Sequence, residues 1–405
     1  MRPLDLSRWR PVPKILIALG ALGVVAGFAV PSLRQQFAYS YLQAYMFFLS
    51  LGLGGLFLVL VHHLFDAGWS VPIRRLNEHL ACLLPIMGFL FIPIAVFAKT
   101  IYPWMSIDPH TDHALHAKLP LFTVPVFYIS ALFCFLVWWW LTFSLRAASL
   151  QQDRDGAVRH TFRLRKLACI GIILFALTLT IAAIMWMKAL QHQWFSTMYG
   201  VYYFAGSVWM TLATVYVTTL ILERQGPLRA VIRPLHYYFI GSLLFAFTVF
   251  YTYIHFAQYF IIWNGNMPEE TFWYLIRERG TWWDIGMIII FGHFFFPFLM
   301  LLRIDIKVRR GPLFWAMLPM CGWAWAMHWI DLAFNIKPIQ HPEGFQMHFL
   351  DVTSFIFIGG VLAVVFLKYF AAHPPYPLRD PRLAEGLGVY VAPASAISTA
   401  PGKVK

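Results

Sequence analysis

Several histidines and aspartates fall inside segments that are otherwise apolar. They are His255, Asp284, His293, His328, Asp331 and Asp351. An ionisable side chain at the centre of a bilayer costs about 2.5–3.5 kcal/mol on insertion scales, so its presence requires a partner, a water-filled cavity or a function. Imidazole and carboxylate groups can exchange protons when their surroundings shift their pKa values toward neutral pH. These six residues are therefore candidate members of a proton relay.

His328 and Asp331 are three residues apart, which places them on one face of a helix and within reach of each other. A hydrogen bond between them would raise the pKa of the histidine toward neutrality and make it a proton acceptor. The same spacing also fits a structural pair that ties this helix to its neighbours. The spacing alone does not decide between these two interpretations.

A polar stripe precedes these residues in the chain. Tyr203, Ser207 and Thr211 follow one another at four-residue intervals, which predicts one face of a helix. Hydroxyl groups in such a row can hold a file of waters along which protons hop. They can equally form hydrogen bonds between helices, so both interpretations stay open.

A second group of ionisable residues lies in the first half of the chain. His62, His63 and Asp66 close one apolar segment. Asp112, His116 and Lys118 belong to a loop that carries six ionisable residues between positions 108 and 118. Single histidines at a membrane surface are usually just solvated, but this density favours a role beyond solvation.

Composition places most of the chain in lipid. Of its 405 residues, 60% are hydrophobic and 12% are charged, whereas an average soluble domain is about 25% charged. Apolar stretches recur that are long enough to cross a hydrocarbon core of about 30 Å. We expect an all-α integral membrane protein with about ten transmembrane helices, near 15–33, 40–64, 79–99, 121–145, 167–189, 197–222, 236–262, 281–303, 313–332 and 349–371.

The positive charges predict an orientation. The net charge is +13, and its basic residues lie in short connections between apolar spans, so nucleic acid is not an expected partner. Counted on alternate sides, 24 of the 31 Lys and Arg residues fall on one side, which the positive-inside rule assigns to the cytoplasm. We expect a multi-pass protein of the bacterial inner (cytoplasmic) membrane with both termini cytoplasmic. The four cysteines have no zinc or iron–sulphur spacing, so no metal site is expected.

A weak internal repeat relates the two halves. Tyr45 with Ser50 has the same five-residue offset as Tyr202 with Ser207, and a Pro-x-Arg string follows each pair. The repeat predicts two parallel four-helix bundles, although apolar helices often resemble one another by chance. The expected units are an N-terminal segment with peripheral helix 1 (1–39), a first bundle of helices 2–5 (40–189), a second bundle of helices 6–9 (190–335), peripheral helix 10 (336–371) and an extended or disordered cytoplasmic tail (372–405).

The second half of the chain contains several longer strings. In chain order they are His192-Gln-Trp-Phe-Ser-Thr-Met-Tyr-Gly-Val-Tyr-Tyr-Phe-Ala-Gly206, Leu244-Phe-Ala-Phe-Thr248 continuing to Gln258-Tyr-Phe-Ile-Ile-Trp263, Pro268-Glu-Glu-Thr-Phe-Trp-Tyr274, His293-Phe-Phe-Phe-Pro-Phe298 and His328-Trp-Ile-Asp331. Together they resemble one family, the second NrfD-like (polysulfide-reductase-type) membrane subunit of bacterial alternative complex III. The resemblance covers about 190–335 through these strings and the rest of the chain through topology alone.

The resemblance implies a ten-helix fold inside a multi-subunit quinol:electron-acceptor oxidoreductase of an electron-transport chain. The implied partners are a sister NrfD-like subunit, an iron–sulphur subunit and a multihaem cytochrome c subunit. Quinol, haem c and iron–sulphur clusters would then belong to those subunits, with no cofactor bound by this chain. The family-matched positions are His192, Trp194, Ser196, Tyr199, Glu269 and Glu270, together with His293, His328 and Asp331. Ser130 stands where the family suggests an arginine, which argues against a quinone pocket in the first bundle.

The expected function is that of a membrane subunit that is not catalytic alone. It would provide a scaffold and a candidate proton path while the sister subunit oxidises quinol. Two alternatives stay open: a quinol-binding subunit in its own right, and a free-standing secondary transporter whose repeats surround a midplane site. His255 and His293 are a single possible pair for haem without a supporting pattern, so haem is not expected.

Overall fold

In a computed structural model, residues 9–308 and 313–389 are described, and every regular element among them is a helix. The long helices are α1 (Pro11–Ala29), α2 (Arg34–Leu64), α8 (Val124–Asp155), α9 (Val158–Trp186), α10 (Tyr199–Gln225), α11 (Pro234–Gly265), α16 (Met317–Ile336) and α17 (Phe349–Ala372). The shorter ones are α3 (Val71–Ala81), α4 (Leu84–Leu90), α5 (Ile92–Val96), α6 (Ala98–Ile101), α7 (His113–His116), α12 (Pro268–Arg277), α13 (Thr281–Ile288), α14 (Phe296–Leu302), α15 (Ile304–Lys307) and α18 (Leu383–Gly386). A π-helical segment, Ile289–Phe295, joins α13 to α14.

The prediction of an all-α integral membrane protein is confirmed. Within the described residues, nine helical segments are long and apolar enough to cross a membrane. The tenth expected span, 313–332, corresponds to α16, which is not among the nine. Its 20 residues include three tryptophans, a histidine, an aspartate and an asparagine, which lower its hydropathy. It nevertheless packs against α10 and α2 inside the molecule.

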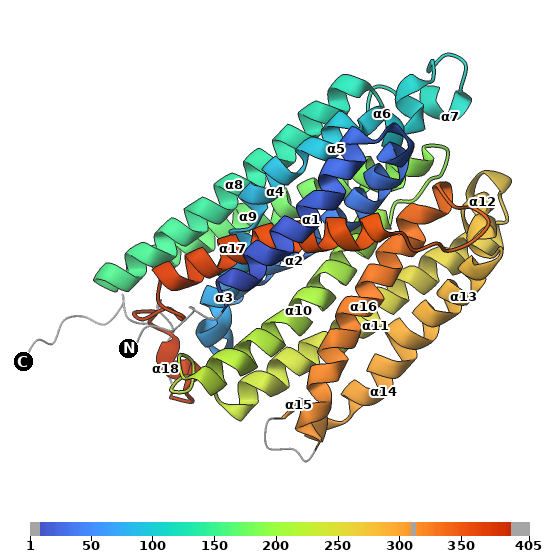
Figure 1. Cartoon of the computed structure of the whole chain (residues 1–405). Coiled ribbons are helices and arrows are strands. Elements are labelled where there is room, and N and C mark those ends of the chain that lie inside the picture. The colour runs from blue at the N-terminus through green and yellow to red at the C-terminus, as the bar shows by residue number, and fades with distance from the viewer. Residues whose placement is uncertain (1–8, 309–312, 390–405) are drawn as a thin grey trace, which may run out of the picture.

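The helices pack in two groups. α2, the segments α3–α6, α8 and α9 form the first, and α10, α11, α13–α14 and α16 form the second, with α2 and α10 in contact between them. α7 and α12 lie at one end of the molecule, called here the α12 end, while α15 and α18 lie at the opposite end, called the α18 end (Figure 1). The division into two four-helix bundles stays a prediction, because α2 and α10 pack against each other as closely as helices within either group.

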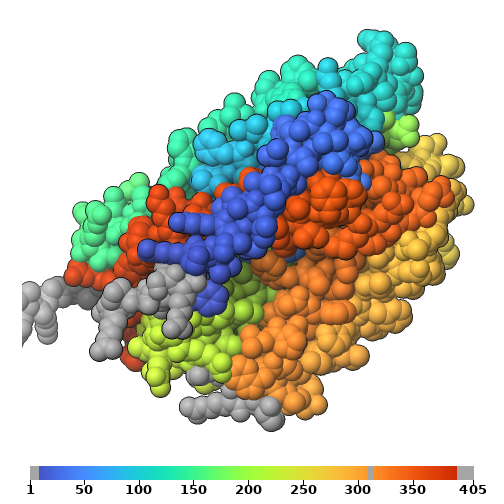
Figure 2. Space-filling view, in the orientation of Figure 1, coloured from blue at the N-terminus to red at the C-terminus, as the bar shows by residue number. Residues whose placement is uncertain are grey.

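α1 and α17 lie outside both groups. They pack against each other and cross on one face of the molecule (Figure 2). A Cβ atom at Gly20 would lie 2.6 Å from the backbone of Phe357, so the two helices approach this closely only because residue 20 is glycine. Small residues at helix contacts have this role in membranes, where close packing replaces the hydrophobic effect as the driving force.

The span expected at 79–99 is not one continuous helix. It begins earlier, at Val71, and is divided into α3, α4, α5 and α6. Pro85 and Pro93 each occupy the second position of a new segment. Proline lacks a backbone N–H and its ring displaces the preceding turn, so a helix restarts there more easily than it continues.

The expectation of an extended or disordered tail from residue 372 is wrong for residues 373–389. Asp380 forms an ion pair with Arg74 of α3, and the backbone N–H of Leu378 donates to Asp153 of α8 at 2.9 Å. α18 packs beside the start of α3. The proline-rich composition suggested a chain that cannot pack, but these polar contacts hold it against the α18 end. Residues 390–405 lie outside the described residues.

Candidate functional site

Asp331 lies at the centre of a polar cluster within the second helix group. It is 2% exposed. Tyr251 of α11 donates a hydrogen bond to its Oδ1 at 2.7 Å, and Tyr202 of α10 donates to the same oxygen. Asn335, one turn further along α16, donates to the Tyr202 hydroxyl at 3.0 Å. Three helices therefore supply hydrogen-bonding groups to one buried carboxylate.

The cluster extends toward the α12 end. The Tyr199 hydroxyl donates to Oδ1 of Asn335 at 2.9 Å. Beyond it, the guanidinium of Arg277 donates to the carbonyls of Phe334 and Asn335 at 2.8 and 2.9 Å and lies over the ring of Trp273. Burial lowers the pKa of Arg277 to about 9, so this arginine is still protonated at neutral pH. A fixed positive charge thus caps the carboxyl end of α16, where a helix dipole favours a cation.

His293 closes the other side of the cluster. Its ring stacks between Tyr251 and Trp209, with centroids 3.8 and 4.0 Å away. The residue is fully buried in the π-helical segment, and neither ring nitrogen has a hydrogen-bond partner within the described residues. π-helical turns often occur at functional sites, where they re-aim a side chain. His255 also contacts this cluster, with its ring 5.4 Å from Tyr202 and 5.9 Å from Tyr251.

The hydrogen bond that the three-residue spacing allowed between His328 and Asp331 does not form. His328 Nε2 is instead 2.9 Å from the Ser50 hydroxyl of α2, in the other helix group. Residues three apart on a helix diverge by about 60° around the axis. That angle is enough to direct His328 toward α2 while Asp331 points between α10 and α11. The structural interpretation, a tie to a neighbouring helix, therefore describes His328.

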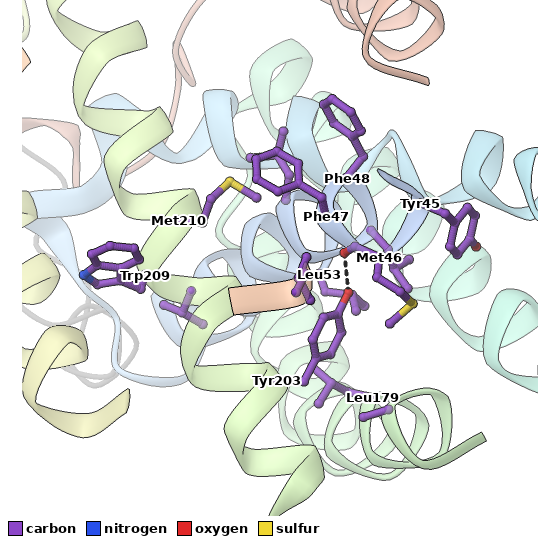
Figure 3. Close-up of a cluster of buried hydrophobic side chains, with 14 of the residues drawn as sticks. Tyr45, Met46, Phe47, Phe48, Leu53, Leu179, Tyr203, Trp209 and Met210 are labelled. Atoms are coloured by element: carbon purple, nitrogen blue, oxygen red, sulfur yellow. Dashed lines mark hydrogen bonds between the residues drawn. The ribbon is translucent and has the colours of Figure 1, made fainter. Parts of the chain in front are cut away.

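The polar stripe of α10 is used in packing. Tyr203 donates to the carbonyl of Met46 in α2 at 2.7 Å (Figure 3), and Thr211 donates to Leu51 of the same helix at 3.4 Å. Ser207 donates to the carbonyl of Tyr203, four residues earlier in its own helix. The hydroxyls of Tyr203 and Thr211 thus form hydrogen bonds between α10 and α2. This use fits the interpretation as interhelical hydrogen bonds better than the interpretation as a file of waters.

Two of the expected relay residues lie elsewhere. Asp284 is exposed, in the first turn of α13, and therefore has no part in the buried cluster. Asp351 is buried but pairs with Lys337 at 2.6 Å and accepts from the backbone N–H of His348 at 2.8 Å. It caps the start of α17, which is a structural role.

The first-half candidates divide between the two ends of the molecule. At the α18 end, His62 Nδ1 is 2.6 Å from the Ser70 hydroxyl, His63 is buried beside it, and Asp66 pairs with Arg165 and Arg382. At the α12 end, Asp112 pairs with His192 at 2.7 Å, a bond that lowers the pKa of Asp112.

The loop before α8, which contains Asp112, makes a second contact at the α12 end. Lys118 donates to the carbonyls of His192 and Trp194, and burial lowers the pKa of Lys118. His116 is exposed. The loop before α8 is thus fastened to the segment before α10.

The remaining family-matched residues lie at the α12 end, where Trp194 contacts α12 and Ser196 contacts α11. Trp194 stacks on Trp273 with centroids 4.5 Å apart and donates to the carbonyl of Glu270. Ser196 donates to Gln258 at 2.6 Å. Glu269 is exposed and Glu270 is partly exposed. These side chains shape the α12 end and do not reach Asp331.

No protein-family model and no curated protein matches this chain. Within the described residues, no group of three or more His, Cys, Asp or Glu side chains is placed to hold a metal ion. The groups of the second helix group that can exchange protons are the Asp331 carboxylate, the hydroxyls of Tyr202 and Tyr251, and the imidazoles of His255 and His293.

A buried ionic cluster at the α18 end was not predicted from the sequence. Glu78 of α3 lies 3.2 Å from Arg74 and 2.8 Å from Arg75, and accepts a hydrogen bond from Ser149 of α8 at 2.7 Å. Arg75 also pairs with Asp153. The signal was present, because Arg74 and Arg75 precede Glu78 by four and three residues, which places all three on one helix face.

Proposed function

We propose that this chain is a membrane subunit of a quinol-oxidising complex of the alternative complex III type. In this proposal it lies in a bacterial inner membrane with both termini in the cytoplasm. A sister NrfD-like subunit, an iron–sulphur subunit and a multihaem cytochrome c subunit would surround it and hold the redox groups. The support is the set of strings between 190 and 335 together with a helix order compatible with two four-helix bundles.

The chain's own contribution in this proposal is a scaffold with a proton path, and the Asp331 cluster carries the proposal. A carboxylate with 2% exposure, contacted by two tyrosine hydroxyls, is expensive to bury. Its hydrogen bonds lead through Asn335 and Tyr199 toward the α12 end. In the proposed orientation that end is periplasmic, the side on which quinol oxidation would release protons.

Substitutions at the cluster test this role in the assembled complex. Asp331→Asn removes the titratable group, and Tyr251→Phe removes one hydroxyl while keeping the ring that stacks on His293. We expect both to lower the number of protons released per electron, with Asp331→Asn having the larger effect. The measurement is proton release alongside quinol oxidation at matched amounts of complex.

Tyr41→Phe is the matched control, because Tyr41 donates only to the carbonyl of Leu90 in the first helix group. It should leave proton release unchanged. If Asp331→Asn also leaves turnover and proton release unchanged, the cluster has no part in proton transfer and only the scaffold role is left.

Membership of the complex needs a separate experiment. Native membranes solubilised in mild detergent should yield this chain together with an iron–sulphur protein and a multihaem cytochrome. Purification of the chain alone or as a homo-oligomer would favour a transporter. Quinone bound in stoichiometric amount to the isolated chain would favour a quinol-binding subunit.

One structural observation disfavours the transporter. Alternating-access folds usually interrupt helices at corresponding positions of both repeats. Here the breaks fall in the second helix of the first group, α3–α6, and in the third helix of the second group, α13–α14. The corresponding helices, α11 and α8, are continuous over 32 residues each.

A further inference from the structure

One outward face of α9 changes from basic to aliphatic within two turns. Its exposed side chains at three- and four-residue intervals are, in order, Arg159, Arg163, Lys166, Ile170, Ile173 and Leu177. This spacing keeps them on a single stripe of the helix. Cations followed by aliphatic groups mark the place where the helix enters the hydrocarbon from the headgroup region.

Two adjoining clefts lie along this stripe, between α8 and α9. The first has a volume of about 490 Å³ and is lined by Gln151, Arg154, Asp155, Arg159, His160 and Arg163. The second, of about 440 Å³, shares Arg159 and Arg163 and continues over Trp140, Phe162, Leu167 and Ile170. A cleft lined by polar and charged residues thus adjoins a cleft lined mainly by apolar side chains.

The charges in the clefts are not balanced. Asp155 is the only carboxylate that lines them, and it is already occupied by Arg159 and His160, each at 2.9 Å. Within the described residues, no carboxylate pairs with the side chains of Arg154, Arg163 or Lys166. Three exposed cations that lack a carboxylate partner in the described part of the chain therefore line the two clefts: Arg154 the first, Lys166 the second, and Arg163 both.

We propose that this α8–α9 groove binds an anionic glycerophospholipid. The lipid phosphate would lie against Arg163 and Lys166, with which no carboxylate pairs among the described residues, and one acyl chain would follow Trp140, Phe162 and Ile170. Free phosphate would contact only the cations. An anionic lipid would place its phosphate at the cations and its acyl chain in the second, apolar cleft, so its negative charge would balance the positive charge of the groove. The site is independent of the proposed function, because it requires only that the chain spans a membrane.

The test uses the purified full chain in detergent, with native mass spectrometry to count bound lipid. The probes are dioleoyl phosphatidylglycerol, dioleoyl phosphatidylcholine and inorganic phosphate. We expect the phosphatidylglycerol to bind at least about tenfold more tightly than the phosphatidylcholine. Arg163→Gln with Lys166→Gln should weaken it by about 30-fold, given about 1 kcal/mol per cation near an anionic headgroup.

Matched controls isolate the groove. Arg229→Gln with Arg279→Gln also removes two exposed cations. These two arginines lie in the connections after α10 and α12, away from the groove, so the substitutions should leave lipid binding unchanged. Trp140→Ala should weaken binding while Trp139→Ala should not, because both tryptophans are exposed on α8 but, of the two, Trp140 alone lines either of these two clefts. The charge-conserving pair Arg163→Lys with Lys166→Arg should retain binding, which separates lost charge from lost folding.

Four outcomes would overturn the proposal. One is equal binding of the two lipids. A second is the same loss in the Arg229 and Arg279 control, and a third is displacement of the lipid by millimolar inorganic phosphate. In assembled complexes, a protein chain that crosslinks to this groove in place of lipid would overturn it as well.

Discussion

Gly206 lies on the face of α10 that meets His328. A Cβ atom at this position would be 3.2 Å from His328 Cε1 and 3.3 Å from Nδ1. Gly206→Ala should therefore push the imidazole away from Ser50. We expect the overpacking cost to exceed the helix gain of about 1 kcal/mol from alanine, and so to lower the free energy of unfolding by up to about 2 kcal/mol. The thermal unfolding midpoint of the purified chain in detergent measures this.

Gly322 provides the control at the same scale. It lies in α16, and a Cβ atom there would have nothing within 4 Å. Gly322→Ala should be neutral or stabilising by up to about 1 kcal/mol, because alanine favours helix over glycine. If both substitutions lowered the midpoint equally, the close contact between α10 and His328 would not be the cause.

At the scale of elements, the start of α17 depends on a buried ion pair. Lys337 and Asp351 are 2.6 Å apart and almost fully shielded from solvent. Lys337→Met would leave the carboxylate buried without its counter-ion, so we expect a loss of about 3–5 kcal/mol of stability. Unfolding of the variant and the parent in the same detergent measures the difference.

A double substitution checks this interpretation. Lys337→Met with Asp351→Leu removes both charges and fills the space with apolar groups, a change that is often neutral or stabilising. Most of the lost stability should therefore return. Stability that falls further in the double variant would mean that Asp351 acts mainly through its backbone cap at His348 and not through the pair.

At the scale of the whole molecule, residues 373–389 link the carboxyl end of α17 to the first helix group. Burial raises the pKa of Asp380, but Arg74 and the hydrogen bonds from Arg74 and the Arg382 backbone more than offset this and leave the pKa below its ordinary value. The carboxylate therefore contributes stability above the ordinary Asp pKa and loses it as the pH falls through the folded-state pKa.

Asp380→Asn should lower stability by about 1–3 kcal/mol at neutral pH, because it replaces a charge-assisted hydrogen bond to a buried arginine. Limited proteolysis at the carboxyl end should also become faster. Glu385→Gln is the control, since its partner Arg382 is partly exposed and such pairs contribute less than about 1 kcal/mol. Equal effects from the two substitutions would show that Asp380 does not hold the segment.

The sequence predicted the helices well because lipid imposes a strong rule: a span must be apolar over about 20 residues. It also selected Asp331, His293 and His255, since a titratable side chain in an apolar run needs an explanation. The same rule could not predict that Asp331 is buried in the cluster while Asp284 is exposed. Both lie in apolar helices, and only the rotation of α13 leaves Asp284 exposed.

Partners of buried charges depended on tertiary structure. His328 and Asp331 share a helix face in sequence, yet their neighbours on α2, α10 and α11 decide which bonds form. Asp380 lies 306 residues from Arg74 along the chain, and no local pattern predicts that contact. The amino-acid sequence by itself therefore determined that this protein is a membrane-spanning helix bundle with ionisable groups inside it. Only the packing of the helices decided which of those groups meet, because a hydrogen bond requires distances and directions that spacing along one helix does not fix.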